Sequence, residues 1–269
     1  MRLPVSGHAV YAYTGTRALD RAQPTVMFVH GAAQDHSVWA LQSRYFAYHG
    51  RNVLAVDLPG HGRSDGESLA SVEAIADWIP TLLDAAGVAN AALVGHSLGA
   101  LAVLECAARH PERVGSIALL GPAAPMPVSD ALLEAAGRND HLAYELITGW
   151  SFSAGKKLGG NPVPGMWMTG NALRLMERSK PDALATDLMA CHIYANGLTA
   201  AAGVRCPALL ILGARDIMAP TKAAQALIDA LAQKRVVTLP DCGHSLMAEE
   251  PDAVLDALRA FLPPAQSEP

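Results

Sequence analysis

The chain has 269 residues, of which 51% are hydrophobic and 17% are charged, and its formal net charge at pH 7 is −5. This length and apolar content suffice for one α/β domain with a sizeable core. No long run of like charges occurs, which argues against a nucleic-acid-binding surface or a polybasic membrane patch, so we expect a small-molecule substrate.

Six short apolar runs are predicted to be strands: residues 25–31, 52–60, 91–95, 116–122, 208–213 and 235–240. Their nearly continuous Val, Leu and Ile content indicates burial on both faces, as in a parallel sheet. Amphipathic helices are predicted among them at residues 68–87, 221–232 and 251–262. Strands that alternate with helices form right-handed βαβ units, so the predicted fold class is α/β with a doubly wound, mostly parallel sheet.

The segment 123–204 interrupts this alternation, because it contains helix-like pieces and no convincing strand. We predict that it is a helical cap inserted over the carboxyl edge of the sheet, and that residues 1–122 and 205–269 form the core. The glycine- and proline-rich stretch 155–165 within it is interpreted as a hinge or lid edge. Residues 263–269 have the composition of a disordered tail.

The N-terminal sequence lacks the sustained apolar stretch of a signal peptide, and no uninterrupted apolar run is long enough to cross a bilayer. These features predict a cytoplasmic protein. Its four cysteines contain no Cys-x-x-Cys pair, so we interpret them as reduced packing residues rather than as disulfides or a zinc site. They are Cys106, Cys191, Cys206 and Cys242.

The predicted strand 91–95 meets an apolar helical run, 100–108, through the sequence Gly-His-Ser-Leu-Gly. This matches the G-x-S-x-G pattern of a nucleophile elbow, in which a sharp, strained turn exposes the serine hydroxyl at the edge of the sheet. Side chains at positions 95 and 99 would collide with the adjacent strand and helix, which explains both glycines. Ser97 is therefore the candidate nucleophile. The alternative is a tight turn in which Ser97 only caps the helix.

A nucleophilic serine needs a base, and the base needs an orienting carboxylate. With this elbow the expected chain order is Ser, then Asp or Glu, then His. Asp216 lies just past one late predicted strand, and His244 lies in the loop after the last one. Because the carboxyl ends of such strands converge on the ligand crevice, we predict that Asp216 is the acid and His244 the base. Taken singly, each residue is equally compatible with a turn or surface role.

An acyl-transfer site also needs two N–H donors for the oxyanion. We expect one from Leu98, which follows the nucleophile, and one from the loop after strand 25–31, where Ala32 is favoured and Ala33 comes second. The loop 59–66, which contains another Gly-x-Gly and a serine, is interpreted as structural. Three histidines near strand ends precede the predicted acid and are interpreted as supporting or structural: His30, His61 and His96.

Five short motifs occur in order along nearly the whole chain: FVHGAA, DLPGHGRSDG, VGHSLGA, LLILGARDIMAP and LPDCGHSLMAEEP. In this arrangement the sequence resembles the α/β-hydrolase fold superfamily, in particular its cap-containing serine hydrolases. The resemblance implies Ser97 as nucleophile, Asp216 as triad acid and His244 as base. It also implies oxyanion donors at Ala32 and Leu98, and a cap at the segment 123–204.

The leading hypothesis is hydrolysis of a small to medium carboxylic ester, thioester or lactone through an acyl-enzyme. One alternative is a carbon–carbon bond hydrolase of ring-cleavage-type diketones, although such enzymes commonly carry an aromatic residue where Ser245 stands. Another is a non-catalytic small-molecule binding protein on the same scaffold. The sequence has no HExxH motif, no Cys/His cluster and no GxGxxG after a strand, so neither a metal nor an organic cofactor is expected.

Large apolar side chains of the predicted cap are candidates for the substrate pocket, since Met and aromatic residues form adaptable apolar walls. They are Trp150, Phe152, Met166, Trp167 and Met168. The alternative is that these side chains only attach the cap to the core.

Overall fold

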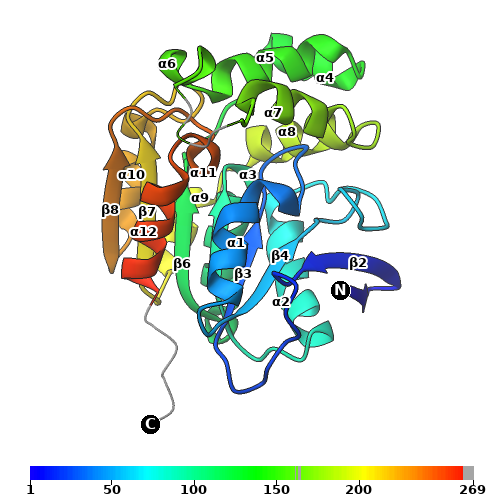
Figure 1. Cartoon of the computed structure of the whole chain (residues 1–269), viewed down its shortest axis with the longest axis vertical. Coiled ribbons are helices and arrows are strands. Elements are labelled where there is room, and N and C mark those ends of the chain that lie inside the picture. Colours follow the sequence, from blue (N-terminus) through cyan, green and yellow to red (C-terminus); the bar gives the residue numbers. More distant parts are fainter. Residues whose placement is uncertain (161, 163–164, 263–269) are drawn as a thin grey trace.

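The computed structural model describes residues 1–160, 162 and 165–262. An eight-stranded sheet runs through the molecule in the order β1-β2-β4-β3-β5-β6-β7-β8 (Figure 1). The strands are β1 (Arg2–Val5), β2 (His8–Tyr13), β3 (Thr25–Val29), β4 (Asn52–Val56), β5 (Ala91–His96), β6 (Val114–Leu120), β7 (Ala208–Gly213) and β8 (Lys234–Leu239). The six strands from β4 to β8 in this order are parallel, and β2 joins them antiparallel. The predicted α/β class with a mostly parallel sheet is confirmed.

The six predicted strands correspond to β3–β8, and the N-terminal hairpin β1–β2 is an addition to them. Every residue of β3, β4, β5 and β7 is buried, as the continuous apolar runs predict. The hairpin turn consists of Ser6 and Gly7, whose φ angles are both positive, 50° and 83°. Such two-residue turns match the twist of the paired strands.

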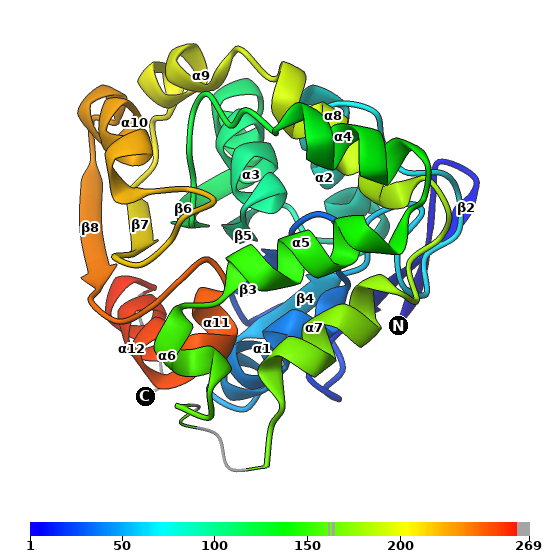
Figure 2. The ribbon, with the colours of Figure 1, turned by 90° about the horizontal axis from the view of Figure 1, so that it is seen from above.

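Helices cover both faces of the sheet (Figure 2). One face carries α1 (Ala40–Ala47), α12 (Pro251–Phe261) and the 3-10 helix η1 (His36–Trp39), which bury Trp39, Phe46 and Leu258 against it. The other face carries α2 (Val72–Ala85), α3 (Leu98–Arg109) and α10 (Gln225–Ala230). The predicted helix 221–232 is divided into η3 (Thr221–Ala224) and α10. Two further short helices are η2 (Pro111–Arg113) and α11 (Leu246–Glu249).

Five helices from the segment between β6 and β7 lie above the carboxyl edge of the sheet (Figure 1). They are α4 (Asp130–Gly137), α5 (His141–Ser151), α6 (Ala154–Lys157), α7 (Met168–Met176) and α8 (Ala183–Ile193), and we call them the cap helices. The next helix, α9 (Gly197–Gly203), packs instead against α3 and α10 of the core. The exact division at residues 122 and 205 stays a prediction.

Two regions singled out in the sequence extend beyond the described residues. Residues 161, 163 and 164 of the glycine- and proline-rich stretch lie outside them, as does the tail, residues 263–269. Among the helices of the described ranges, none has both the length and the apolar character required to cross a membrane.

Candidate active site

Ser97 lies on the sharp turn between β5 and α3, with φ 53° and ψ −117°. A Cβ atom on Gly95 would lie 2.2 Å from the carbonyl oxygen of Gly99, and one on Gly99 would lie 2.4 Å from the carbonyl oxygen of Val29. Neither backbone oxygen can move aside, so only glycine fits at both positions. The Ser97 side chain makes no capping hydrogen bond to α3. The turn therefore holds the backbone of Ser97 in a strained conformation, and α3 does not use the hydroxyl as its cap.

Asp216 and His244 form a buried pair at the ends of β7 and β8. The Nδ1 atom of His244 lies 2.7 Å from Oδ2 of Asp216, and Oδ1 of Asp216 accepts hydrogen bonds from the amides of Met218 and Ala219, both at 2.8 Å. Burial alone would raise the pKa of Asp216, but His244 and the two amides outweigh it and hold this pKa below its ordinary value. Because an ionised carboxylate only accepts, Nδ1 of His244 carries the proton and leaves Nε2 as a base.

Several buried groups fix the loop that carries His244. The His96 ring donates from Nε2 to the carbonyl oxygen of His244 at 2.8 Å, and the amides of His244 and Ser245 both donate to the carbonyl oxygen of Ser151 in α5. Glu249, which is fully buried, accepts from the amides of Gly243 and Ser153 at 3.0 Å each. The position of the base thus depends on the elbow, on a cap helix and on a buried glutamate.

Sequence reasoning missed Glu249, which ends the four-residue helix α11. Nothing in that local pattern distinguishes it from Glu250, which is half-buried and ion-paired with Lys156. Its role becomes visible only when the loop after β8 is folded against the end of α5.

The loop after β3 contains the two alternative oxyanion donors, Ala32 and Ala33, and their amides differ in what they contact. The amide of Ala33 donates to Oδ2 of Asp187 at 2.8 Å, so this N–H is already engaged. Ala32 lines the same cavity as Ser97 and His244. Leu98, the first residue of α3, directly follows Ser97, and helix N-termini carry free amides and the positive end of the helix dipole. This arrangement favours Ala32 over Ala33 as the partner of Leu98.

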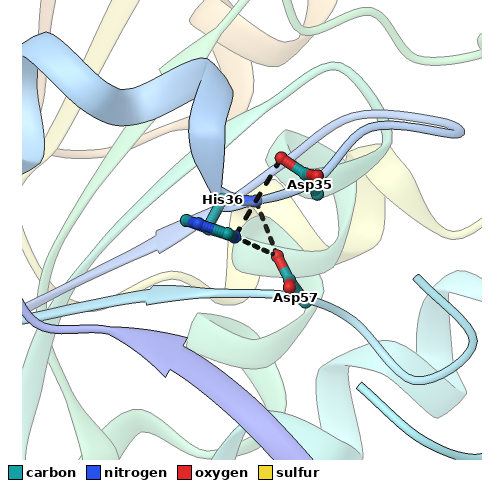
Figure 3. A group of neighbouring side chains, drawn as sticks. All are labelled: Asp35, His36 and Asp57. Carbon is teal, nitrogen blue, oxygen red and sulfur yellow. Dashed lines mark hydrogen bonds and ion pairs between the residues drawn. The ribbon is translucent and has the colours of Figure 1, made fainter. Parts of the chain in front are cut away.

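A cluster of Asp35, His36 and Asp57 joins the end of this loop to the start of the loop after β4, with one potential ligand atom of each within 4.8 Å of the others (Figure 3). Oδ1 of Asp57 accepts from both the amide and the Nδ1 of His36 at 2.7 Å, and Oδ2 accepts from the amide of Arg63 at 2.8 Å. Asp35 accepts from the amide of Ser37. Because Nδ1 of His36 donates to Asp57, it has no lone pair for a metal ion. We interpret the cluster as a clamp between the loops after β3 and β4.

Ser97, His244 and Ala32 line a cavity of about 330 Å³ below the cap helices. Most of its wall is apolar, with Met126, Leu132, Ile147, Trp150, Leu188 and Met218 among its lining residues. A second cavity, of about 380 Å³, shares Gln34, Ile147 and Ser151 with the first. The two cavities therefore lie side by side, with α5 contributing to both.

The five predicted pocket residues occupy different places. Trp150 lines the cavity that contains Ser97, whereas Phe152, Met166 and Met168 line the second cavity. Trp167 lines neither of the two, because its ring packs over Gly170 and 69% of its surface is exposed.

Comparison with known proteins identifies the family of the chain. The sequence pattern of the Alpha/beta hydrolase family matches residues 26–257. A pimeloyl-[acyl-carrier protein] methyl ester esterase of Aromatoleum aromaticum is 31% identical over 246 residues, which cover 86% of this chain and 94% of that protein.

Solved structures of similar shape include two hydrolytic enzymes. The enol-lactonase of Burkholderia xenovorans LB400 superposes with a TM-score of 0.85 and 25% identity, covering 97% of this chain and 99% of the lactonase. An esterase of Exiguobacterium antarcticum has a TM-score of 0.84 at 17% identity, covering 97% of this chain and 98% of the esterase, a likeness of fold alone. With the family pattern spanning most of its length, the chain belongs to the alpha/beta hydrolase family and is a hydrolytic enzyme.

Proposed function

We propose that this hydrolase cleaves a small to medium carboxylic ester, thioester or lactone through an acyl-enzyme on Ser97. The observation that carries the proposal is the buried His244–Asp216 pair, whose Nδ1–Oδ2 hydrogen bond leaves Nε2 as a base in the cavity that Ser97 also lines. Relatives named as methyl ester esterases and a similar structure named as an enol-lactonase support ester and lactone substrates.

The first half of the reaction forms the acyl-enzyme. Nε2 of His244 takes the proton of Ser97 as Oγ attacks the carbonyl carbon, and the carbonyl π electrons move onto the oxygen. The amides of Ala32 and Leu98 donate to this oxyanion, while Asp216 stabilises the new imidazolium. The carbonyl then re-forms, the bond to the leaving oxygen or sulfur breaks, and His244 returns the proton to that atom.

The second half releases the acid. His244 takes a proton from water as the water oxygen attacks the acyl carbon of the ester on Ser97. A second oxyanion forms in the same place and collapses, and the bond to Oγ breaks as Ser97 regains its proton from His244. For a lactone, the alcohol stays attached to the released acid.

The test is hydrolysis of a p-nitrophenyl ester series, from acetate to decanoate, together with labelling by a fluorophosphonate. We expect turnover with an optimum at a medium chain length, because the cavity of about 330 Å³ is mostly apolar. Peptide mass spectrometry should find the phosphonyl adduct on Ser97. Absence of turnover on esters, thioesters and lactones, or an adduct on a different residue, would contradict the proposal.

Replacing Trp150 by alanine should shift the chain-length preference towards longer acyl groups, because its indole forms part of the cavity around Ser97. We expect the ratio of kcat/KM for decanoate over acetate to rise about tenfold, the usual effect of one or two methylene groups gaining room in an apolar pocket. Trp167→Ala is the matched control, since this indole lines neither cavity, and it should leave the ratio unchanged. The same ratio in both variants would remove Trp150 from the acyl-binding wall.

A further inference from the structure

The cap helix α8 contributes one buried carboxylate to the core. Asp187 is 1% exposed, and its Oδ2 accepts two hydrogen bonds, from the amide of Ala33 at 2.8 Å and from Nε2 of His61 at 2.9 Å. Ala33 belongs to the loop after β3 and His61 to the loop after β4. A single oxygen atom of the cap therefore joins two loops at the carboxyl edge of the sheet, across 154 and 126 residues of chain.

His61 faces this carboxylate as an imidazolium. Its Nδ1 lies 2.9 Å from the carbonyl oxygen of Pro59 and its Nε2 faces Asp187, and because both partners only accept, both ring nitrogens carry protons. Burial alone would lower the pKa of His61, but the carboxylate of Asp187 outweighs it and raises this pKa. Asp187 and His61 are thus a buried ion pair.

The neighbouring histidine stays neutral beside this pair. The ring of His30 lies 5.1 Å from that of His61, and its Nε2 accepts from the amide of Leu58 at 3.1 Å, so only Nδ1 carries a proton. That proton is donated to the carbonyl oxygen of Gly31 at 2.8 Å. Burial, together with the charge of His61, lowers the pKa of His30 to about 4. The two histidines have separate tasks: His61 pairs with the cap, and His30 joins the loops after β3 and β4.

The conformation of Ala33 explains why a carboxylate is useful here. Its φ is 51°, in the left-handed region that non-glycine residues rarely adopt, and it is 1% exposed within a cluster of cap side chains. A strained backbone of this kind persists only where its surroundings hold it. The charge-assisted hydrogen bond to Asp187 does so, and it thereby sets the direction of the preceding residue, Ala32, beside Ser97.

We propose that Asp187 is a positioning residue through which the cap orients the oxyanion loop, with His61 holding its carboxylate in place. The oxyanion hole is then complete only when α8 is seated on the core. The proposal rests on the proposed function, in which Ala32 donates to the oxyanion. It assigns to the cap a part in stabilising the transition state, in addition to covering the substrate.

The same helix offers a matched control. At the carboxyl end of α8, the hydroxyl of Tyr194 donates to Oε2 of Glu105 in α3 at 2.7 Å, and both side chains are buried. Asn196 donates to the same carboxylate. This second attachment of α8 to the core does not involve the loop after β3. Tyr194→Phe therefore weakens the seating of the helix without touching Ala33.

The experiment compares wild type, Asp187→Ala, Asp187→Asn and Tyr194→Phe. For each, kcat and KM are measured on the best p-nitrophenyl ester, with the melting temperature and the Ki of a trifluoromethyl ketone. Attack of Ser97 on this ketone forms a tetrahedral adduct whose oxygen occupies the oxyanion hole, so its Ki reports the hole.

For Asp187→Ala we expect kcat to fall about 30- to 100-fold, less than the loss of a whole oxyanion donor, with Ki rising in proportion and KM changing little. Asp187→Asn can place its amide oxygen where Oδ2 accepts from both donors but loses the charge, so its kcat should lie between Asp187→Ala and wild type. Tyr194→Phe should lower the melting temperature while kcat and Ki stay within about threefold of wild type.

Two results would overturn the proposal. One is an Asp187→Ala variant whose kcat and Ki match those of Tyr194→Phe, because Asp187 would then only attach the cap. The other is a change confined to KM. If Asp187→Ala does not fold, Asp187→Asn decides the question by the same comparison. A wild-type protein that neither turns over esters nor binds the ketone would instead contradict the proposed function, and this inference with it.

Discussion

Replacing Ser97 by alanine should lower kcat/KM on the best p-nitrophenyl ester by about 10⁴- to 10⁶-fold, the loss seen when the nucleophile of a triad is removed. The substrate cavity is lined by many other residues and should still bind ligands. We therefore expect the affinity for a carboxylic acid product to change little. Steady-state kinetics and isothermal titration calorimetry measure the two effects.

The strained turn adds a second expectation, on stability. Alanine has the same Cβ atom as serine, so Ser97→Ala keeps the unfavourable backbone conformation at φ 53° and should melt near the wild type. Glycine adopts positive φ readily, so Ser97→Gly should be more stable than Ser97→Ala by about 1 kcal/mol. Both variants should be inactive. Retention of more than a tenth of wild-type turnover by either variant would remove Ser97 from the reaction.

The position of Ser97 could be predicted because its constraints are local in the sequence. A Cβ atom on Gly95 or on Gly99 would lie within 2.5 Å of a backbone oxygen, so both positions require glycine. Two glycines around a serine at a strand–helix junction are visible directly in the sequence. Asp216 and His244 could be located for a related reason, since each follows a predicted strand, Asp216 the fully buried β7 and His244 the edge strand β8. The burial on both faces expected for the run 235–240 was wrong, because β8 pairs only with β7 and most of its residues are exposed. Parallel strands bring their carboxyl ends to one edge of the sheet, so the positions of these residues after successive strands indicate that they lie at the same edge.

The supporting contacts could not be predicted, because they join residues that are distant in the chain. Asp187 lies within an apolar stretch of α8, 154 positions along the chain from Ala33, so no local pattern indicates their contact. The N-terminal hairpin was missed for a different reason. Its strands are short, and the turn signal, Ser6-Gly7, is weaker than the Asn-Gly or Asp-Gly sequences that usually indicate such hairpins.

Side-chain direction limited the prediction of the pocket. Trp150 and Trp167 both belong to an aromatic- and Met-rich part of the predicted cap, and composition alone treats them alike. Trp150 lies in the last turn of α5 and lines the cavity around Ser97, whereas Trp167 lies at the start of α7 and packs over Gly170. Which of the two contacts a substrate depends on how α5 and α7 are rotated, and that is set by packing.

Asp216→Asn should lower kcat by about 10⁴-fold even though the side chain keeps its shape, because it enforces the wrong tautomer of His244. Oδ1 of Asp216 accepts from two backbone amides, so the amide oxygen of asparagine takes that place and its NH₂ group faces His244. Nδ1 must then accept, and the ring proton moves to Nε2. A protonated Nε2 cannot take the proton of Ser97.

Asp216→Ala should differ from Asp216→Asn in the opposite sense for stability and for activity. It leaves the amides of Met218 and Ala219 without an acceptor, which costs about 1–3 kcal/mol for each buried donor, whereas asparagine preserves both hydrogen bonds. It does not, however, force a proton onto Nε2. Asp216→Asn should therefore be the more stable variant, while Asp216→Ala should be at least as active. Denaturant unfolding measures the first difference and kcat measures the second. An asparagine variant within tenfold of wild-type kcat would contradict the argument.

The pH dependence of stability separates the charge of Asp216 from its shape. Its pKa in the folded protein lies below the ordinary value of 3.8, so the folded state binds this proton less tightly than the unfolded state. The ionised carboxylate therefore stabilises the fold above pH 3.8, and this contribution is lost as the pH falls through the folded pKa. Asparagine has no proton to bind, so the wild type should exceed Asp216→Asn in unfolding free energy at pH 7 and lose that advantage on acidification. A difference that stays constant between pH 7 and the acid range would mean that the pair stabilises the fold through packing alone.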